Sequence, residues 1–175
     1  MNTPSPKTSL TFSQAIAKTQ FLIARIDKNK LSETEIQQEV SSILSTKNGG
    51  RGFLVCYLTS DIPLADKPSL GIIEALKSSI EISGELLVKN IAMSSAMIET
   101  HRRNHDRENL EGSKKVYQRT SNLIQIIDSK FIKEELQKLQ ITIQNGFGKY
   151  QCFLARWNYD IEQKESILKA VSNII

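Results

Sequence analysis

The chain has 175 residues, which is enough for one ordinary domain with a substantial core and short for two. Hydrophobic residues make up 39% of it and charged residues 24%, a composition that excludes a disordered or low-complexity polymer. Lysine and arginine exceed aspartate and glutamate by 23 to 19, and so modest an excess gives only weak support for nucleic-acid binding.

The N-terminal segment and the length of the apolar stretches bear on the location of the protein. Residues 1–9 are rich in proline, serine and threonine, so we expect a flexible leader followed by a single helical domain over residues 10–175. The leader lacks the apolar stretch of a secretory signal, and no window reaches the roughly 18 to 20 apolar residues of a membrane span. We therefore expect a cytoplasmic protein without membrane contact.

Two cysteines, Cys56 and Cys152, lie far apart and show no metal-binding spacing. Their neighbours are apolar, which indicates two reduced thiols in the core rather than a disulfide framework.

The first two helices are predicted by their N-terminal caps. Thr11 with Gln14, and Ser32 with Glu35, form capping-box patterns in which both side chains accept hydrogen bonds from free backbone N–H groups. Apolar residues with a helical period follow each box. We expect the segment KNGG, residues 47–50, to end the second helix, because glycine is unfavourable inside helices.

The segment FLVCYLT, residues 53–59, is ambiguous. Its aromatic and branched residues favour a strand, whereas its length suits a short helix equally well. A strand would have no partner within the chain, and its backbone groups would lack hydrogen bonds unless it paired with a second subunit. We favour a helix.

From residue 69 onward the pattern is helical almost to the end of the chain. A glycine at 112 predicts a break or a kink, and the NG pair at 145–146 predicts a helix end. Helices that are apolar on one side bury that side only against each other, so we predict an all-α antiparallel bundle of six or seven helices with Phe153 and Trp157 as large core residues. The apolar period predicts these helices over 70–79, 84–109, 116–127, 132–143 and 150–171.

The segment ETHRRNHDREN, residues 99–109, is the strongest candidate for a metal site. On one continuous helix, His101, His105 and Glu108 would share a face, and imidazole and carboxylate donors suit zinc, iron or manganese. The Glu-x-x-His pairs of di-iron bundles are missing, however, and three nearby arginines raise the electrostatic cost of holding a cation. The alternative interpretation is that an apolar stripe ends in solvent at this point.

A basic set overlaps this segment and could bind phosphates or an acidic partner surface, because arginine matches oxyanions geometrically. Acidic residues are interleaved with the basic ones and their helical directions diverge, so a solvated face with internal ion pairs is the alternative. The set consists of Arg102, Arg103, Arg107, Lys114, Lys115 and Arg119.

The segment YQCFLARWNYD near the C-terminus offers a candidate interface made of Arg156, Trp157 and Tyr159. Residues two apart on a helix point in different directions, so Trp157 and Tyr159 cannot both face the core. The one that does not is expected to be exposed or to lie in an interface.

Catalytic motifs are absent, and GFGK at 146–149 lacks the length and the following serine or threonine of a phosphate-binding loop. We therefore predict a non-catalytic interaction or regulatory protein that acts through a helical surface and binds a protein partner or itself. The stripe over 84–109 and FLVCYLT are the reasons to expect a homodimer. The alternatives are a helical bundle that binds a transition metal and a protein whose basic surface binds anions or nucleic acid. The predicted interaction protein requires no cofactor.

Overall fold

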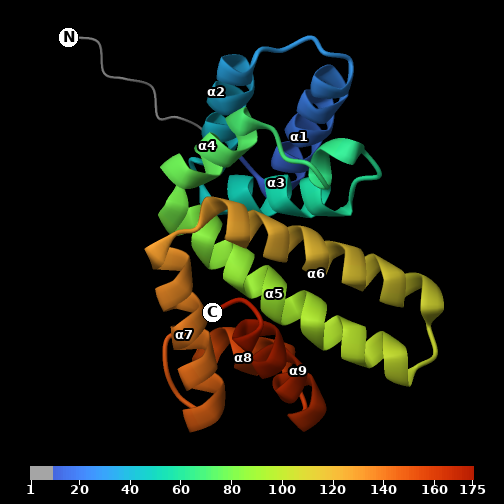
Figure 1. Ribbon diagram of the computed structural model, residues 1–175, viewed down its shortest axis with the longest axis vertical. Helices are drawn as coiled ribbons and strands as arrows, with labels where there is room; N and C mark the ends of the chain where they lie inside the picture. The colour runs from blue at the N-terminus through green and yellow to red at the C-terminus, as the bar shows by residue number, and fades with distance from the viewer. Residues whose placement is uncertain (1–9) are drawn as a thin grey trace.

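The fold is all-helical in the part of the chain that the computed structural model describes, residues 10–175 (Figure 1). The predicted helical bundle is confirmed, but nine α-helices lie in this range where six or seven were expected. The predicted leader, residues 1–9, lies outside the described residues. The helices are α1 (Phe12–Asp27), α2 (Glu33–Leu44), α3 (Lys47–Thr59), α4 (Leu70–Ser78), α5 (Ile80–Arg103), α6 (Arg107–Ile127), α7 (Lys130–Asn145), α8 (Gln151–Trp157) and α9 (Ile161–Ser172), with a short 3₁₀ helix at Pro63–Ala65.

Helix α5 is the centre of the arrangement. Helices α1 to α4 pack as one group, with α1 against α3 and α2 against α4. Helices α5 and α6 form a long antiparallel hairpin below this group, and α7 to α9 cover the other side of α5 (Figure 1). Because α5 contacts α3, α4, α6, α7 and α9, its faces are the ones most constrained by neighbours.

Both predicted capping boxes are present. The side chains of Thr11 and Ser32 accept hydrogen bonds from the backbone N–H groups of Gln14 and Glu35, whose own side chains accept from the cap residues. The helices that follow bury their apolar stripes, and those of α2, Ile36, Val40, Ile43 and Leu44, lie in the core. Local capping signals therefore fixed the start of α1 and α2 correctly.

The second helix ends just before KNGG, at Leu44, but KNGG is not the predicted helix stop, because these residues form the first turn of α3. Thr46 caps the helix and accepts a hydrogen bond from the N–H of Gly49 at 3.0 Å. A Cβ atom at Gly52 would lie 2.5 Å from the Cβ of Ala15, so glycine here allows α1 and α3 to pack closely. The helical interpretation of FLVCYLT is confirmed, with Phe53 and Tyr57 fully buried.

The predicted continuous helix over 84–109 is also wrong. Helix α5 ends at Arg103, and His105 adopts the left-handed conformation with φ of 56°. Asp106 then caps α6 by accepting a hydrogen bond from the N–H of Asn109 at 3.2 Å. Histidine tolerates a left-handed turn better than most residues, so a tight reversal forms without glycine or proline. Gly112, where we predicted a break, lies inside α6.

A second unpredicted break divides the last helix. Asn158 has a φ of 48° and ends α8, and α9 starts after a third capping box made by Asp160 and Gln163. The predicted single helix over 150–171 is therefore wrong, whereas the predicted helix end at Gly146 is confirmed by its φ of 79°.

The core is aliphatic as predicted, but its large residues differ from the predicted ones. Trp157 is 49% exposed and Phe153 only partly buried, and the fully buried rings belong to Phe53, Tyr57 and Tyr150. Cys152 is exposed and Cys56 is half-buried, so the prediction of two buried thiols is wrong. None of the helices described for residues 10–175 combines the length and the apolar character that crossing a membrane requires.

Candidate functional site

Two grooves run along opposite sides of α5. The first, which we call the α6-side groove, lies between α5 and α6 beside the end of α3 and has a volume of about 480 Å³. The second, the α9-side groove, lies between the C-terminal half of α5 and α9 and has a volume of about 720 Å³. The two grooves share no lining residue, so they can be compared as independent surfaces of one helix.

The α6-side groove has an apolar middle and polar ends. Met93 and Met97 of α5 and Val116 of α6 line it, and none of the three is fully buried. Because α5 and α6 are antiparallel, His101 and Asn109 lie toward one end, near the turn between the helices. Toward the other end, Lys115 pairs with the exposed Asp61 at 2.7 Å.

Gly112 keeps this groove open on the α6 side. It lies inside a helix, where glycine is less favourable than alanine by about 1 kcal/mol. A Cβ atom at this position would meet no heavy atom within 4 Å, so packing within the chain does not explain the glycine. Gly49 and Gly52, in contrast, are required by close contacts within α1 to α3.

His101 lies at the end of the groove with a side chain that is 16% exposed. Its Nδ1 atom is 3.6 Å from Oδ2 of Asp106, the residue that caps α6. Hydrogen bonds from the side chain and backbone of Asn109, and to a smaller extent the nearby His101, lower the pKa of Asp106 below its ordinary value. The carboxylate is therefore charged at neutral pH and is held in place beside the imidazole.

Of the predicted metal-binding residues, His101 and His105 line one small pocket together, but Glu108 does not line it. The break after α5 places His105 in the turn and Glu108 in the first turn of α6, and both side chains are exposed. Among residues 10–175, no group of three or more His, Cys, Asp and Glu side chains is arranged to hold a metal ion. The prediction relied on a continuous helix, and that premise is wrong.

Arg119, a member of the predicted basic set, stabilises the contact between two parts of the fold. Its side chain is only 4% exposed and binds both carboxylate oxygens of Asp66, at 2.7 and 2.9 Å. It also donates to the backbone oxygens of Leu58 and Ser60 at the end of α3. Arg119 thus joins α6 to the segment after α3 and offers no surface for an anion.

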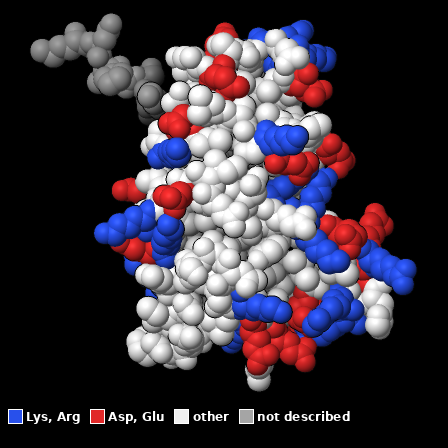
Figure 2. All heavy atoms as spheres, viewed as in Figure 1, with Lys and Arg blue, Asp and Glu red and all other residues white. Residues whose placement is uncertain are grey.

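The other basic residues are mostly paired with acids. Lys114 pairs with Glu111 and Lys115 with Asp61, while Arg102 and Arg103 belong to the α9-side groove described next. Figure 2 shows the same pattern on the visible face, where acidic and basic side chains alternate along the edges and no purely basic area is seen. The predicted anion surface is therefore divided among separate ion pairs.

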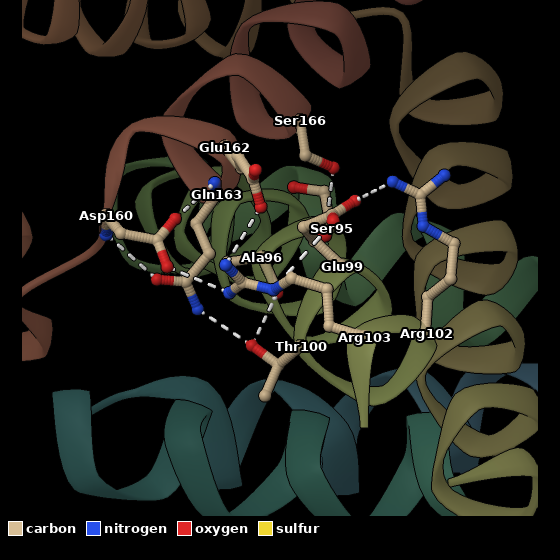
Figure 3. A network of polar contacts seen from close by, with 10 residues as sticks. All are labelled: Ser95, Ala96, Glu99, Thr100, Arg102, Arg103, Asp160, Glu162, Gln163 and Ser166. Carbon is tan, nitrogen blue, oxygen red and sulfur yellow. Dashed lines mark hydrogen bonds and ion pairs between the residues drawn. The ribbon is translucent and has the colours of Figure 1, made fainter. Parts of the chain in front are cut away.

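A polar network lies along the α9-side groove (Figure 3). Arg103 donates to Asp160 at 2.8 Å and to Glu162 at 2.9 Å, and so links the end of α5 to the start of α9. Glu99, which is largely buried on α5, pairs with Arg102. Hydrogen bonds from the backbone of Gln163, followed by the Arg103 contact, lower the pKa of Asp160.

Two further hydrogen bonds complete this network. The side-chain amide of Gln163 donates to the hydroxyl of Thr100 at 2.8 Å, and the hydroxyl of Ser166 donates to the backbone oxygen of Ser95 at 3.0 Å. Nearly every polar group drawn in Figure 3 thus has a partner within the chain. These contacts beside the α9-side groove attach α9 to α5.

The break at Asn158 separates the residues of the predicted C-terminal interface from one another. Trp157 and Arg156 are exposed on α8, whereas Tyr159 is 6% exposed and belongs to the core. Burial raises the pKa of the Tyr159 hydroxyl to about 12. The expectation that one of the two aromatic residues is exposed is confirmed, although a helix break and not helical spacing separates them.

Sequence reasoning missed Met93, Met97 and Gly112. A signal for the methionines was present, because Met93, Met97 and His101 are each four residues apart and so lie on one side of α5. For Gly112 no signal was available, because a glycine beside an open groove and a glycine at a helix break look alike in a sequence.

The fold and the grooves define an all-α helical-bundle protein. Residues 11–174 match the family described as "Uncharacterised conserved protein UCP020893", and the chain belongs to that family. No curated protein and no solved structure matches the chain.

Proposed function

We propose that the chain is a non-catalytic interaction protein that binds a helical segment of a protein partner in the α6-side groove. The observation that supports this proposal is the open, partly apolar surface between α5 and α6 beside Gly112. Gly112 lines this surface and has no side chain, so the α6 side of the groove is left uncovered.

The dimensions of the groove define the kind of partner. From Asn90 to His101 the groove follows α5 over about 16 Å, at 1.5 Å per residue. This length suits about three turns of an amphipathic helix, whose apolar side chains at positions i, i+3 or i+4 and i+7 would lie against Met93, Met97 and Val116. Methionine side chains are flexible and adapt to differently shaped partners.

Polar groups at the two ends would set the direction of the bound segment. The ion pair of Lys115 with Asp61 and the imidazole of His101 can form hydrogen bonds to side chains beyond the apolar stretch of the partner. The expected homodimer is one form of this proposal, in which the partner segment belongs to a second copy. Light scattering over a range of protein concentrations distinguishes that form from binding to a different protein.

Peptides selected on the wild-type protein from a library of random amphipathic helices test the proposal. Gly112→Trp fills the groove from its open side and should weaken binding of these peptides at least tenfold. Gly112→Ala adds only a methyl group to empty space and should leave binding within about twofold, and circular dichroism verifies that both variants are folded. Equal binding to the wild type and to Gly112→Trp would refute the proposal.

A further inference from the structure

We propose that the α6-side groove also holds a soft monovalent metal ion, copper(I) or silver(I), bound by the sulfur atoms of Met93 and Met97 and by Nε2 of His101. All three side chains line this one groove. The proposal concerns a metal site and does not depend on the partner helix proposed above. It also differs from the predicted set with His105 and Glu108, which the helix break separates.

The spacing of the three residues brings their side chains into reach of one ion. Residues four apart on a helix are separated by about 6 Å along the axis and by about 40° around it. Side chains on a helix tilt toward its N-terminus, so His101 leans toward Met97 and Met97 leans toward Met93. An ion on the N-terminal side of Met97 then lies in the direction in which both Met97 and His101 point, and the flexible Met93 side chain turns outward to meet it.

The chemistry of the donors selects the ion. Thioether sulfur is a soft ligand that favours copper(I), whereas zinc and iron favour imidazole together with thiolate or carboxylate. The proposed set has two thioethers and one imidazole and carries no negative charge, so it offers little compensation to a divalent ion. A monovalent ion adds only one charge to a groove whose lining holds one lysine, Lys115, which is paired with Asp61.

Asp106 supplies the outer contact that a metal-binding histidine usually has. Its carboxylate lies 3.6 Å from Nδ1 of His101 and favours a proton on that nitrogen, which leaves Nε2 with a free electron pair. Asn109 holds the carboxylate in position through its backbone and side-chain N–H groups, the latter at 2.6 Å. The carboxylate is therefore in position beside the imidazole before any ion binds.

The partial exposure of the site permits an ion to enter from solvent. Met97 is 37% exposed and the His101 side chain is 16% exposed. This intermediate exposure keeps the sulfur atoms accessible while the surrounding apolar side chains limit the approach of water.

Silver(I), which is stable in air, is the probe for the test. The full chain is labelled with ¹³C at the methionine methyl groups, and Cys56 and Cys152 are replaced by serine because thiolates bind silver strongly. At one equivalent of silver nitrate we expect the Met93 and Met97 methyl signals and the His101 ring signals to shift together and then saturate. The third methionine, Met1, is an internal control and should not shift.

Two variants test the assignment of roles. Met97→Leu keeps the volume of the side chain but removes the sulfur, and should weaken silver binding at least tenfold in competition with a chelator. Asp106→Asn keeps the helix cap and removes the charge beside His101, and should weaken binding by about tenfold. Zinc(II) should leave the methionine signals unchanged.

Three results would overturn the proposal: no shift at one equivalent, an equal shift at Met1, or unchanged affinity in Met97→Leu. Peptide binding by the same variants separates this proposal from the proposed function. Met97→Leu retains an apolar side chain, so it should still bind the selected peptides even where it no longer binds silver. Equal peptide binding to the wild type and to Gly112→Trp, with silver binding to the wild type intact, would instead count against the partner helix alone.

Discussion

The two grooves along α5 differ in how their polar groups are used. In the α9-side groove, Arg103, Asp160 and Glu162 are joined by ion pairs that attach α9 to α5. In the α6-side groove, the middle is lined by Met93 and Met97, and charged groups are confined to the ends. One helix therefore carries both surfaces, and the α6-side groove exposes apolar side chains where the α9-side groove is crossed by ion pairs.

The difference indicates that groove size is a poor guide to function in this protein. The α9-side groove is the larger at about 720 Å³, yet Arg103, Asp160 and Glu162 beside it are already joined by ion pairs. A ligand there would have to replace existing ion pairs, whereas a ligand in the α6-side groove would cover exposed apolar surface, which is favourable.

The largest expected effect comes from the buried face of α5 that supports both grooves. Ile91 is fully buried, and Ile91→Ala should lower the free energy of unfolding by about 2 to 5 kcal/mol because it removes apolar contacts and leaves a cavity. Urea unfolding measures this change. Ile91→Val is the matched control and should cost only about 0.5 to 1.5 kcal/mol; equal losses for the two variants would contradict the assigned packing.

Gly112→Ala tests whether the space beside Gly112 in the α6-side groove is open. Alanine favours the helix by about 1 kcal/mol over glycine, and its methyl group meets open space. We expect the variant to be more stable than the wild type by up to about 1 kcal/mol in urea unfolding. A loss of stability would show that the space beside α6 is filled in solution.

Arg103→Met tests whether the α9-side network is an attachment. Methionine keeps much of the apolar stem but removes the contacts to Asp160 and Glu162. Hydrogen exchange of backbone amides should become several-fold faster in α9 while that of α6 is unchanged. Equal acceleration in both helices would mean that the network contributes to global stability and does not specifically hold α9.

The smallest expected effect concerns acid pH. The pKa of Asp160 is lower in the folded protein than its ordinary value of 3.8, so its charge stabilises the fold above that pH. This contribution is lost as the pH falls from 3.8 through the folded pKa. Asp160→Asn keeps the cap but does not titrate, so the stability difference from the wild type should be constant near neutrality and shrink below pH 3.8. A difference independent of pH would contradict the assigned charge role.

The sequence predicted those elements whose signals are local. The capping boxes at Thr11 and Ser32 and the glycine end at Gly146 depend on hydrogen bonds within a few residues, and each was found as expected. Gly49 and Gly50 of KNGG were misinterpreted because their role is close contact, with Ile43 in α2 and with Ile82 and Leu86 in α5, which only the three-dimensional structure reveals.

The helix breaks show the same limit at the candidate site. His105 and Asn158 reverse the chain in left-handed conformations without glycine or proline, so the apolar period continues across both turns in the sequence. His101 was identified as a candidate, but its assumed neighbours changed when the helix ended at Arg103. The four-residue spacing of Met93, Met97 and His101 shows that they share one side of a helix, but it does not show that this side lines an open groove.

Chemical-shift mapping is the most direct test of the claim that the α6-side groove is the ligand-binding side of α5. A peptide selected on the wild type would be titrated into isotope-labelled protein, and the backbone amide signals of all helices would be followed. The account predicts shifts concentrated around Met93, Met97 and Gly112, with α9 unaffected. Shifts concentrated around Arg103 and Glu162, with the α6-side groove unchanged, would contradict it.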